Sequence, residues 1–172
     1  MTKRMAVLAL AVGMTIPGFM QTGFTQALAQ TGVPQKRPKV SAAAPGAVTK
    51  AYLQKIWDGW ATLDAAAQKQ YYAQGPHVFF DIAPLKYASW DEYQVGVSKD
   101  LATYKAARFV VNDDAQIHKS GEAYWSTATI ASDMTRKSDK REMTTFRWTA
   151  VFEKQNGTWL IVHEHVSMAQ PD

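Results

Sequence analysis

The stretch that decides the fold is TTFRWTAVFEK (144–154), QNGT (155–158) and WLIVHEHVS (159–167). Two long runs rich in β-branched and aromatic residues flank Asn156-Gly157. This dipeptide is typical of a two-residue hairpin turn, because both positions tolerate a positive φ. The runs also contain four ionisable side chains: Arg147, His163, Glu164 and His165. Because a buried charge is costly unless it is paired or used, we expect a functional site to involve this hairpin.

Apolar periodicity predicts helices before the hairpin. The spacing of Tyr52, Ile56, Trp60 and Leu63 predicts one helix over 48–67, and a shorter one is expected over 65–73. Ser89 followed by Glu92 forms a capping box that begins a third helix, which should end near Lys105.

Alternating or continuous apolar runs predict the strands. The expected strands are 77–82, 106–119, 123–134, 142–154 and 159–168. Helices followed by an antiparallel meander indicate an α+β domain. We expect a curved antiparallel sheet that wraps around the N-terminal helices as a cone, an α+β barrel whose open mouth would suit a small molecule.

The N-terminal segment is expected to direct export. Lys3 and Arg4 precede an apolar run, and Ala27-Leu28-Ala29 resembles a cleavage site. This layout predicts a signal peptide over 1–29, with an uncleaved membrane anchor as the weaker alternative. Residues 30–47 read as a flexible linker, and 48–172 as one domain. We therefore expect a periplasmic or secreted protein with no stable membrane anchor after cleavage.

Composition excludes several classes of function. The chain contains no Cys, which excludes disulfides, thiol nucleophiles and thiolate metal sites. Removal of Lys3 and Arg4 reduces the 19 basic residues to 17 against 15 acidic ones, and three of those 17 lie in the linker. The domain is thus close to neutral, and we expect no nucleic-acid partner. Phosphate-loop and dinucleotide motifs are absent, so no cofactor is expected.

Four motifs resemble the nuclear transport factor 2-like superfamily, and within it the SnoaL-like group. They are Phe79-Phe80-Asp81, Trp90-Asp91-Glu92-Tyr93, Arg147-Trp148-Thr149 and the hairpin segment 156–167. The resemblance covers the chain from about Val48 onward and implies a cone-shaped barrel that is often dimeric through its sheet. Its members include ketosteroid isomerases, polyketide cyclases, dehydratases and non-catalytic association modules, so the fold leaves function open.

The resemblance to ketosteroid isomerases suggests roles for particular residues. Their catalytic Asp base corresponds to Asp81, whose pKa an apolar setting would raise. Their two acidic oxyanion-hole positions correspond to Trp57 and Thr149, which are weaker hydrogen-bond donors. The resemblance also directs Arg147 and Thr149 into the cone, where Arg147 would bind a substrate carboxylate or form a structural salt bridge.

Strand alternation divides the last strand into two faces. Leu160, Val162 and Glu164 are the more apolar set, so we place Glu164 inside, with Arg147 as its partner. His163 and His165 would then lie on the outer face, unless a β-bulge reverses the end of the strand. A metal site built on these two histidines and His77 or His118 is an alternative, but a structural or interface role is favoured over metal binding.

Aromatic residues complete the predicted site. Trp57, Tyr93, Tyr124, Ser126, Thr149, Glu164, His163 and His165 are candidate ligand-binding residues, and Asp81 and Arg147 are candidate catalytic residues. Trp125 and Trp148 should point outward and form a homodimer surface. The predicted function is binding of a small, partly apolar molecule, with cofactor-free isomerase or lyase chemistry as one outcome. A non-catalytic ligand-binding or association module is the alternative.

Overall fold

The computed structural model describes residues 46–170. The predicted signal peptide and nearly all of the predicted linker lie outside these residues. The elements, in chain order, are α1 (Lys50–Trp60), the 3₁₀ helix η1 (Ala66–Tyr71), β1 (Phe79–Phe80), α2 (Trp90–Leu101), β2 (Tyr104–Val111), β3 (Gln116–Ser120), β4 (Ala123–Arg136), β5 (Arg141–Gln155) and β6 (Thr158–Met168). No helix among the described residues is long and apolar enough to cross a membrane.

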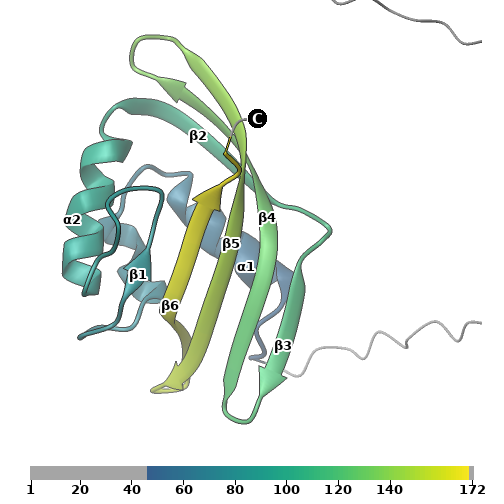
Figure 1. The fold of residues 1–172 in the computed structure, drawn as a ribbon. Coiled ribbons are helices and arrows are strands. Elements are labelled where there is room, and N and C mark those ends of the chain that lie inside the picture. Colours follow the sequence, from purple (N-terminus) through teal and green to yellow (C-terminus); the bar gives the residue numbers. More distant parts are fainter. Residues whose placement is uncertain (1–45, 171–172) are drawn as a thin grey trace, which may run out of the picture. The chain divides into compact units, whose positions relative to one another are not determined.

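The α+β prediction is confirmed. One curved, unclosed sheet has the strand order β1-β6-β5-β4-β2, and β3 also pairs with β4. Figure 1 shows α1 lying behind the sheet and α2 standing beside β1. The β5–β6 hairpin turns at Asn156 and Gly157, which have φ angles of 50° and 84°. These positive angles at both central residues match the turn that the sequence predicts.

Two predicted helices are too long. The helix α1 ends at Trp60, because Leu63 adopts a φ of 61° and Thr62 Oγ1 donates to the Gly59 carbonyl. The helix α2 begins after Ser89, whose side chain accepts from the Glu92 N–H, as predicted. It ends at Leu101, because Tyr104 already pairs with Arg136 in the sheet.

The strand predicted over 106–119 is two strands. β2 and β3 both pair with β4, but residues 112–115 leave the ladder between them. Asp114 Oδ1 accepts from the Thr129 N–H at 3.0 Å, and Asn112 Nδ2 donates to Thr129 Oγ1 at 2.9 Å. These short polar side chains bind Thr129 of β4 in place of backbone groups, so the pairing with β4 continues while the strand itself is broken.

The core lies between α1 and the inner face of the sheet. Inward residues of β5 alternate regularly, and the buried set is Phe146, Trp148, Ala150 and Phe152. The register between β5 and β6 shifts at Val151/Phe152. Because of this bulge, Ile161 is buried together with Glu164 and Val166, although the three do not alternate. The strict alternation expected for this strand is therefore wrong, because Ile161 and Glu164, three positions apart, both face the core.

Candidate functional site

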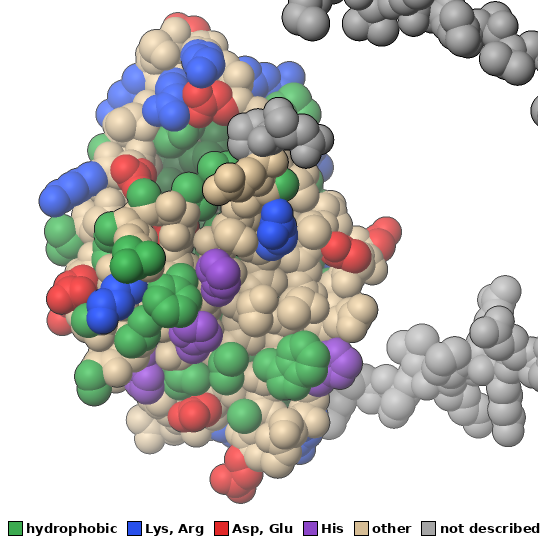
Figure 2. All heavy atoms as spheres, viewed as in Figure 1, with side chains coloured by type: hydrophobic (Ala, Val, Ile, Leu, Met, Phe, Trp, Pro, Cys, Tyr) green, Lys and Arg blue, Asp and Glu red, His purple; other side chains and the backbone are tan. Residues whose placement is uncertain are grey.

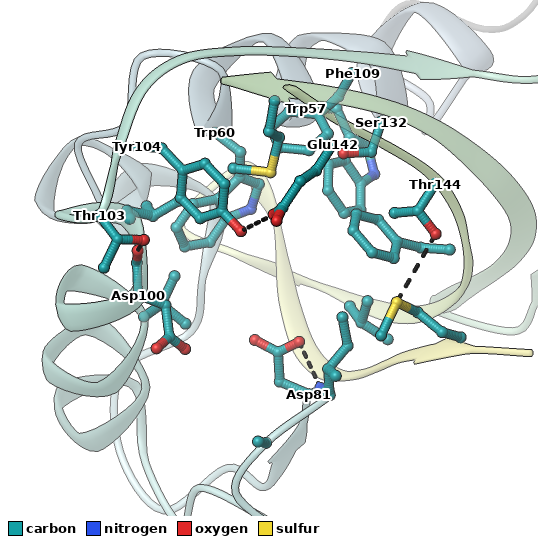
Figure 3. A pocket seen from close by; sticks show the side chains of 18 of the residues that line it. Trp57, Trp60, Asp81, Asp100, Thr103, Tyr104, Phe109, Ser132, Glu142 and Thr144 are labelled. Carbon is teal, nitrogen blue, oxygen red and sulfur yellow. Dashed lines mark hydrogen bonds between the residues drawn. The ribbon is translucent and has the colours of Figure 1, made fainter. Parts of the chain in front are cut away.

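A hollow of about 560 Å³ opens at the end of the sheet near the β4–β5 hairpin. Its wall combines the end of α2, the beginnings of β2 and β5, the ends of β4 and β6, and the residues that follow β1 (Figure 3). Six aromatic rings line it: Trp57, Trp60, Tyr93, Tyr104, Phe109 and Phe146. Five acidic or basic side chains line it as well: Asp81, Asp100, Arg136, Glu142 and Glu164.

The pairing of β1 with β6 brings two acids together. These strands run parallel, and Phe79 lies opposite Glu164. Side chains alternate along a strand, so Asp81 returns to the inner side that Phe79 occupies. Two carboxyl groups that are far apart in the sequence therefore reach the same hollow.

Glu164 is 1% exposed and is held by hydrogen-bond donors. The Tyr72 hydroxyl donates to both carboxyl oxygens at 3.0 Å, and Trp148 Nε1 donates to Oε2 at 2.9 Å. The Tyr72 oxygen in turn accepts from Trp60 Nε1 at 3.1 Å. Burial raises the pKa of Glu164 to about 7 and outweighs these donors, and the charge of Asp81 adds to the rise.

Asp81 lies where β1 ends. Its Oδ1 accepts from the Ile82 N–H at 2.7 Å. Burial raises the pKa of Asp81 to about 6 against that hydrogen bond, and the charge of Asp100 adds to the rise. No cationic side chain among residues 46–170 forms a salt bridge with Asp81, so nothing lowers its pKa by charge pairing.

A charged network lies on the opposite wall of the hollow. Arg136 Nε donates to Glu142 Oε1 at 2.8 Å, and Lys140 Nζ lies 2.9 Å from the same oxygen. The Tyr104 hydroxyl donates to Glu142 Oε2 at 3.0 Å (Figure 3). The hydrogen bonds from Arg136 and Lys140 hold the pKa of Glu142 at about 2. Glu142 therefore stays ionised, and its charge is matched by its neighbours.

Two buried polar atoms in the wall have no partner. Trp57 Nε1 and Ser132 Oγ make no hydrogen bond within the described structure, although their residues are only 6% and 4% exposed. An unsatisfied buried donor costs free energy. Both residues line the hollow, so a bound molecule with polar atoms would satisfy them.

Four of the ten predicted site residues line the hollow: Asp81, Glu164, Trp57 and Tyr93. Tyr124 and Ser126 lie on the inner side of β4 but near its other end, outside the hollow. Tyr124 packs there against Trp159, with ring centroids 4.8 Å apart. Ser126 is fully buried in the same filled part of the core.

The predicted inward position of Arg147 and Thr149 is wrong. Arg147 is exposed and Thr149 is half-buried, whereas Trp148 between them is 1% exposed. Alternation therefore directs both residues to the outer face of the sheet. Consequently Arg147 cannot be the partner of Glu164, and Trp148 is not part of an outward patch. The partners of Glu164 are the neutral donors Tyr72 and Trp148.

His163 and His165 lie on the outer side of the sheet, beside Phe80. Their rings meet that of Phe80 edge-on, with centroids 5.3 and 5.8 Å away. His163 Nδ1 donates to the Val78 carbonyl at 2.7 Å. Figure 2 shows histidine and apolar side chains gathered on this face. Within residues 46–170, no group of three or more His, Cys, Asp or Glu residues is placed to hold a metal ion.

Sequence reasoning missed several residues of this site. Ser132 interrupts the apolar stripe Ala128, Ile130, Met134 on β4. A polar residue in such a stripe indicates a candidate site residue. Asp100 follows Tyr93 by seven residues and thus shares its helical face. The role of Tyr72 had no local signal, because its hydroxyl reaches Glu164 across 92 residues.

Comparison with known proteins identifies the fold independently. Residues 50–171 match the model of the SnoaL-like domain family. No curated protein sequence matches significantly.

Solved structures of nuclear transport factor 2-like proteins are similar to this chain. A superfamily protein from Salmonella enterica aligns with a TM-score of 0.62 at 19% identity, covering 71% of this chain and 92% of its own. A proposed dehydratase from Streptomyces avermitilis aligns with a TM-score of 0.61 at 13% identity. This alignment covers 71% of this chain and 96% of that protein. A protein with a cystatin-like fold from Caulobacter vibrioides aligns with a TM-score of 0.58 at 14% identity. This alignment covers 72% of this chain and 88% of that protein. The chain therefore belongs to the family of SnoaL-like domains and has the fold of the nuclear transport factor 2-like superfamily.

Proposed function

We propose that the hollow binds a small, partly apolar organic molecule and catalyses cofactor-free proton transfer of the isomerase or dehydratase type. One observation carries the proposal. Asp81 and Glu164, with pKa values raised to about 6 and about 7, line the same largely aromatic hollow. Perturbed carboxyl groups in a pocket are typical of acid–base catalysis. The dehydratase assignment in the name of the Streptomyces neighbour is in keeping with this chemistry.

Asp81 is the proposed general base. Above pH 6 its carboxylate is mostly ionised, and the apolar wall makes it a stronger base than an exposed aspartate. It would take a proton from carbon next to a carbonyl, so that the C–H electron pair becomes an enolate. Returning the proton to a different carbon completes an isomerisation, and loss of a neighbouring hydroxyl as water completes a dehydration.

Neutral donors would steady the developing negative charge. The free Trp57 Nε1 and the protonated form of Glu164 are the groups placed in the wall for this role. Arg147 has no part in this scheme, because it lies on the outer face of the sheet.

The test uses 5-nitrobenzisoxazole, which reports a carboxylate base whatever the natural substrate is. Removal of its ring C–H proton breaks the N–O bond and releases a coloured phenolate. We expect Asp81→Asn to lower the rate by about 100-fold or more, a typical contribution of a positioned base. Arg147→Gln is the matched control and should leave the rate unchanged.

The pH profile adds a second criterion. The rate should rise with pH through an apparent pKa near 6, because Asp81 must lose its proton, and should fall above about pH 7, where Glu164 loses the proton that it would donate. A wild-type rate no higher than that of free acetate at the same concentration, or an Asp81→Asn variant of full activity, would remove Asp81 from the mechanism.

We also propose that the outer face of the sheet forms a homodimer, which is the association alternative. Trp125 is 40% exposed there and stacks on His118, with ring centroids 4.0 Å apart. An exposed aromatic pair of this kind is typical of an interaction surface. Sedimentation velocity of the domain should give a dimer that Trp125→Asp dissociates. A wild-type monomer at micromolar concentration would exclude this interface.

Export remains part of the proposal. The expected cleavage before Gln30 rests on the Ala27-Leu28-Ala29 sequence. The intact mass of protein recovered from the periplasm should match a chain that begins at Gln30. Recovery of the full-length chain in the cytoplasm would contradict it.

A further inference from the structure

The charges around the hollow are unbalanced. Four carboxyl groups and one guanidinium line it. The guanidinium, Arg136, lies 2.8 Å from Glu142, and Lys140, which does not line the hollow, lies 2.9 Å from the same carboxyl group. The other three carboxyl groups belong to Asp81, Asp100 and Glu164, and no salt bridge within residues 46–170 involves them.

These three carboxyl groups act on one another. Figure 3 shows the carboxyl groups of Asp81 and Asp100 side by side in the part of the hollow below Tyr104, and both residues line it. The charge of Asp100 helps to raise the pKa of Asp81, after burial, and the charge of Asp81 helps to raise that of Glu164. A cation among them would relieve this repulsion, whereas an anionic ligand would increase it.

The aromatic wall suits a cation as well. Ring faces attract ammonium and guanidinium groups when these lie within about 6 Å of the ring centre. The hollow already contains one such contact, because the Arg136 guanidinium lies 4.6 Å from the centre of the Tyr104 ring. Further rings from Trp57, Trp60 and Tyr93 line the same space.

An independent observation indicates that the hollow receives a polar ligand. Ser132 is 4% exposed, lines the hollow, and its Oγ has no hydrogen-bond partner. That hydroxyl lies across the hollow from Asp81 and Asp100 (Figure 3), so it can bind a polar atom in the body of the ligand. Trp57 Nε1 also has no partner within the described structure. Because an indole N–H can only donate, it would bind an oxygen atom in the body of the ligand.

We propose that the molecule bound in this hollow is an amphipathic organic cation: a protonated amine held between Asp81 and Asp100, with an apolar body against the aromatic wall. This inference rests on the proposed function, because it names the ligand class of the same site. In this arrangement Asp100 is the binding carboxylate, and Asp81 remains the base. An apolar carboxylic acid of the same shape is disfavoured, because it would meet three carboxyl groups that form no salt bridge within residues 46–170.

Three probes of equal length test the proposal: 4-phenylbutylammonium, 4-phenylbutanol and 4-phenylbutyrate. Their binding is measured by calorimetry at pH 8 and moderate salt. We expect the ammonium probe to bind about tenfold more tightly than the alcohol, equivalent to one favourable charge contact, and the carboxylate probe to bind most weakly.

The pH dependence separates the charge effect from the shape effect. The amine stays protonated between pH 5 and 8, so a change in its affinity reports the protein. Its affinity should fall several-fold at pH 5, because Asp81 and Glu164, with pKa values of about 6 and about 7, take up protons. Binding of the alcohol should change little over this range.

A matched pair of variants on α2 locates the contact. Asp100→Asn should weaken binding of the ammonium probe several-fold and leave binding of the alcohol unchanged. Asp91→Asn, an exposed acid in the first turn of the same helix, is the control and should change neither.

Three results would overturn the inference: equal or tighter binding of the alcohol or the carboxylate, no effect of Asp100→Asn, or no binding of any probe at millimolar concentration. The elimination reaction judges the proposed function separately, because its probe is neutral. Catalysis by Asp81 without a preference for the amine would therefore defeat this inference alone. A preference for the amine without catalysis would defeat only the proposed chemistry.

Discussion

The two faces of the β5–β6 hairpin differ in the solvent exposure of their polar side chains. On the inner face, Glu164 is 1% exposed and is surrounded by Tyr72, Trp148 and other rings of the core. On the outer face, Arg147 and His165 are exposed to solvent. These residues belong to the same two strands and lie only a few positions apart.

The difference shows that the face of the strand decides which polar side chains are buried, and burial changes the chemistry of Glu164. The inner carboxyl has a pKa raised to about 7, because burial disfavours its charge and its donors are neutral. The same group on the outer face would be hydrated. One step along a strand thus separates a potential acid–base group from a solvated one.

The largest expected effect concerns the two tryptophans on opposite faces. Trp148→Ala should reduce the free energy of unfolding by about 3–5 kcal/mol, because it leaves a cavity and removes a donor to Glu164. Trp125→Ala on the outer face should cost less than about 1 kcal/mol in the monomer, because Trp125 is 40% exposed. Urea unfolding of both variants measures the contrast, and equal losses would contradict the assignment of the two faces.

A second effect concerns pH. The carboxyl of Glu164 ionises near 4.5 in the unfolded chain and at about 7 in the folded protein. The raised pKa of Glu164 therefore adds to the free energy of unfolding at low pH. This stabilisation is complete below pH 4.5, is lost as the pH rises to about 7, and amounts to about 3 kcal/mol at most. Glu164→Gln should remove this loss, so its stability relative to wild type should increase from pH 4.5 to 7.5.

Urea unfolding at a series of pH values measures this slope. The exposed Glu153→Gln on β5 is the matched control and should keep the wild-type slope. Parallel curves for wild type and Glu164→Gln would mean that Glu164 is hydrated in the folded protein.

The smallest effect distinguishes the two outer histidines. His163 Nδ1 donates to the Val78 carbonyl, whereas the His165 side chain makes no hydrogen bond within residues 46–170 and its ring packs edge-on against Phe80. We expect His163→Ala to cost about 1 kcal/mol, the net value of one hydrogen bond, and His165→Ala less. Neither variant should change the rate of the 5-nitrobenzisoxazole reaction. A lower rate in either would place the outer face in the site.

The sequence was sufficient for the fold because its signals are local. The Asn156-Gly157 turn, the Ser89 cap and the strand alternation each act within a few residues, and the structure contains all three. The resemblance predicts Asp81 as a site residue, and the apolar stripe of the last strand predicts that Glu164 faces inward.

The geometry of the site depended on long-range features. The resemblance predicts that Arg147 on β5 faces inward, and this is wrong. The apolar residues Phe146 and Trp148 alternate with Arg147, and it is their face of β5 that packs in the core. The bulge at Val151/Phe152 changes which residues of β6 are buried, and no local pattern indicates it. The contact between Tyr72 and Glu164 follows only from tertiary packing.

The central claim is that Asp81 and Glu164 share a sheltered hollow in which burial raises both pKa values. A ¹³C NMR titration of the side-chain carboxyl groups, assigned with Asp81→Asn and Glu164→Gln, tests it directly. We predict midpoints near 6 for Asp81 and near 7 for Glu164. Asp81→Asn should lower the Glu164 midpoint, whereas Glu164→Gln should change the Asp81 midpoint little, because Glu164 is still mostly protonated when Asp81 titrates. Midpoints near the ordinary values of 3.8 and 4.5, unaffected by the other substitution, would contradict the account.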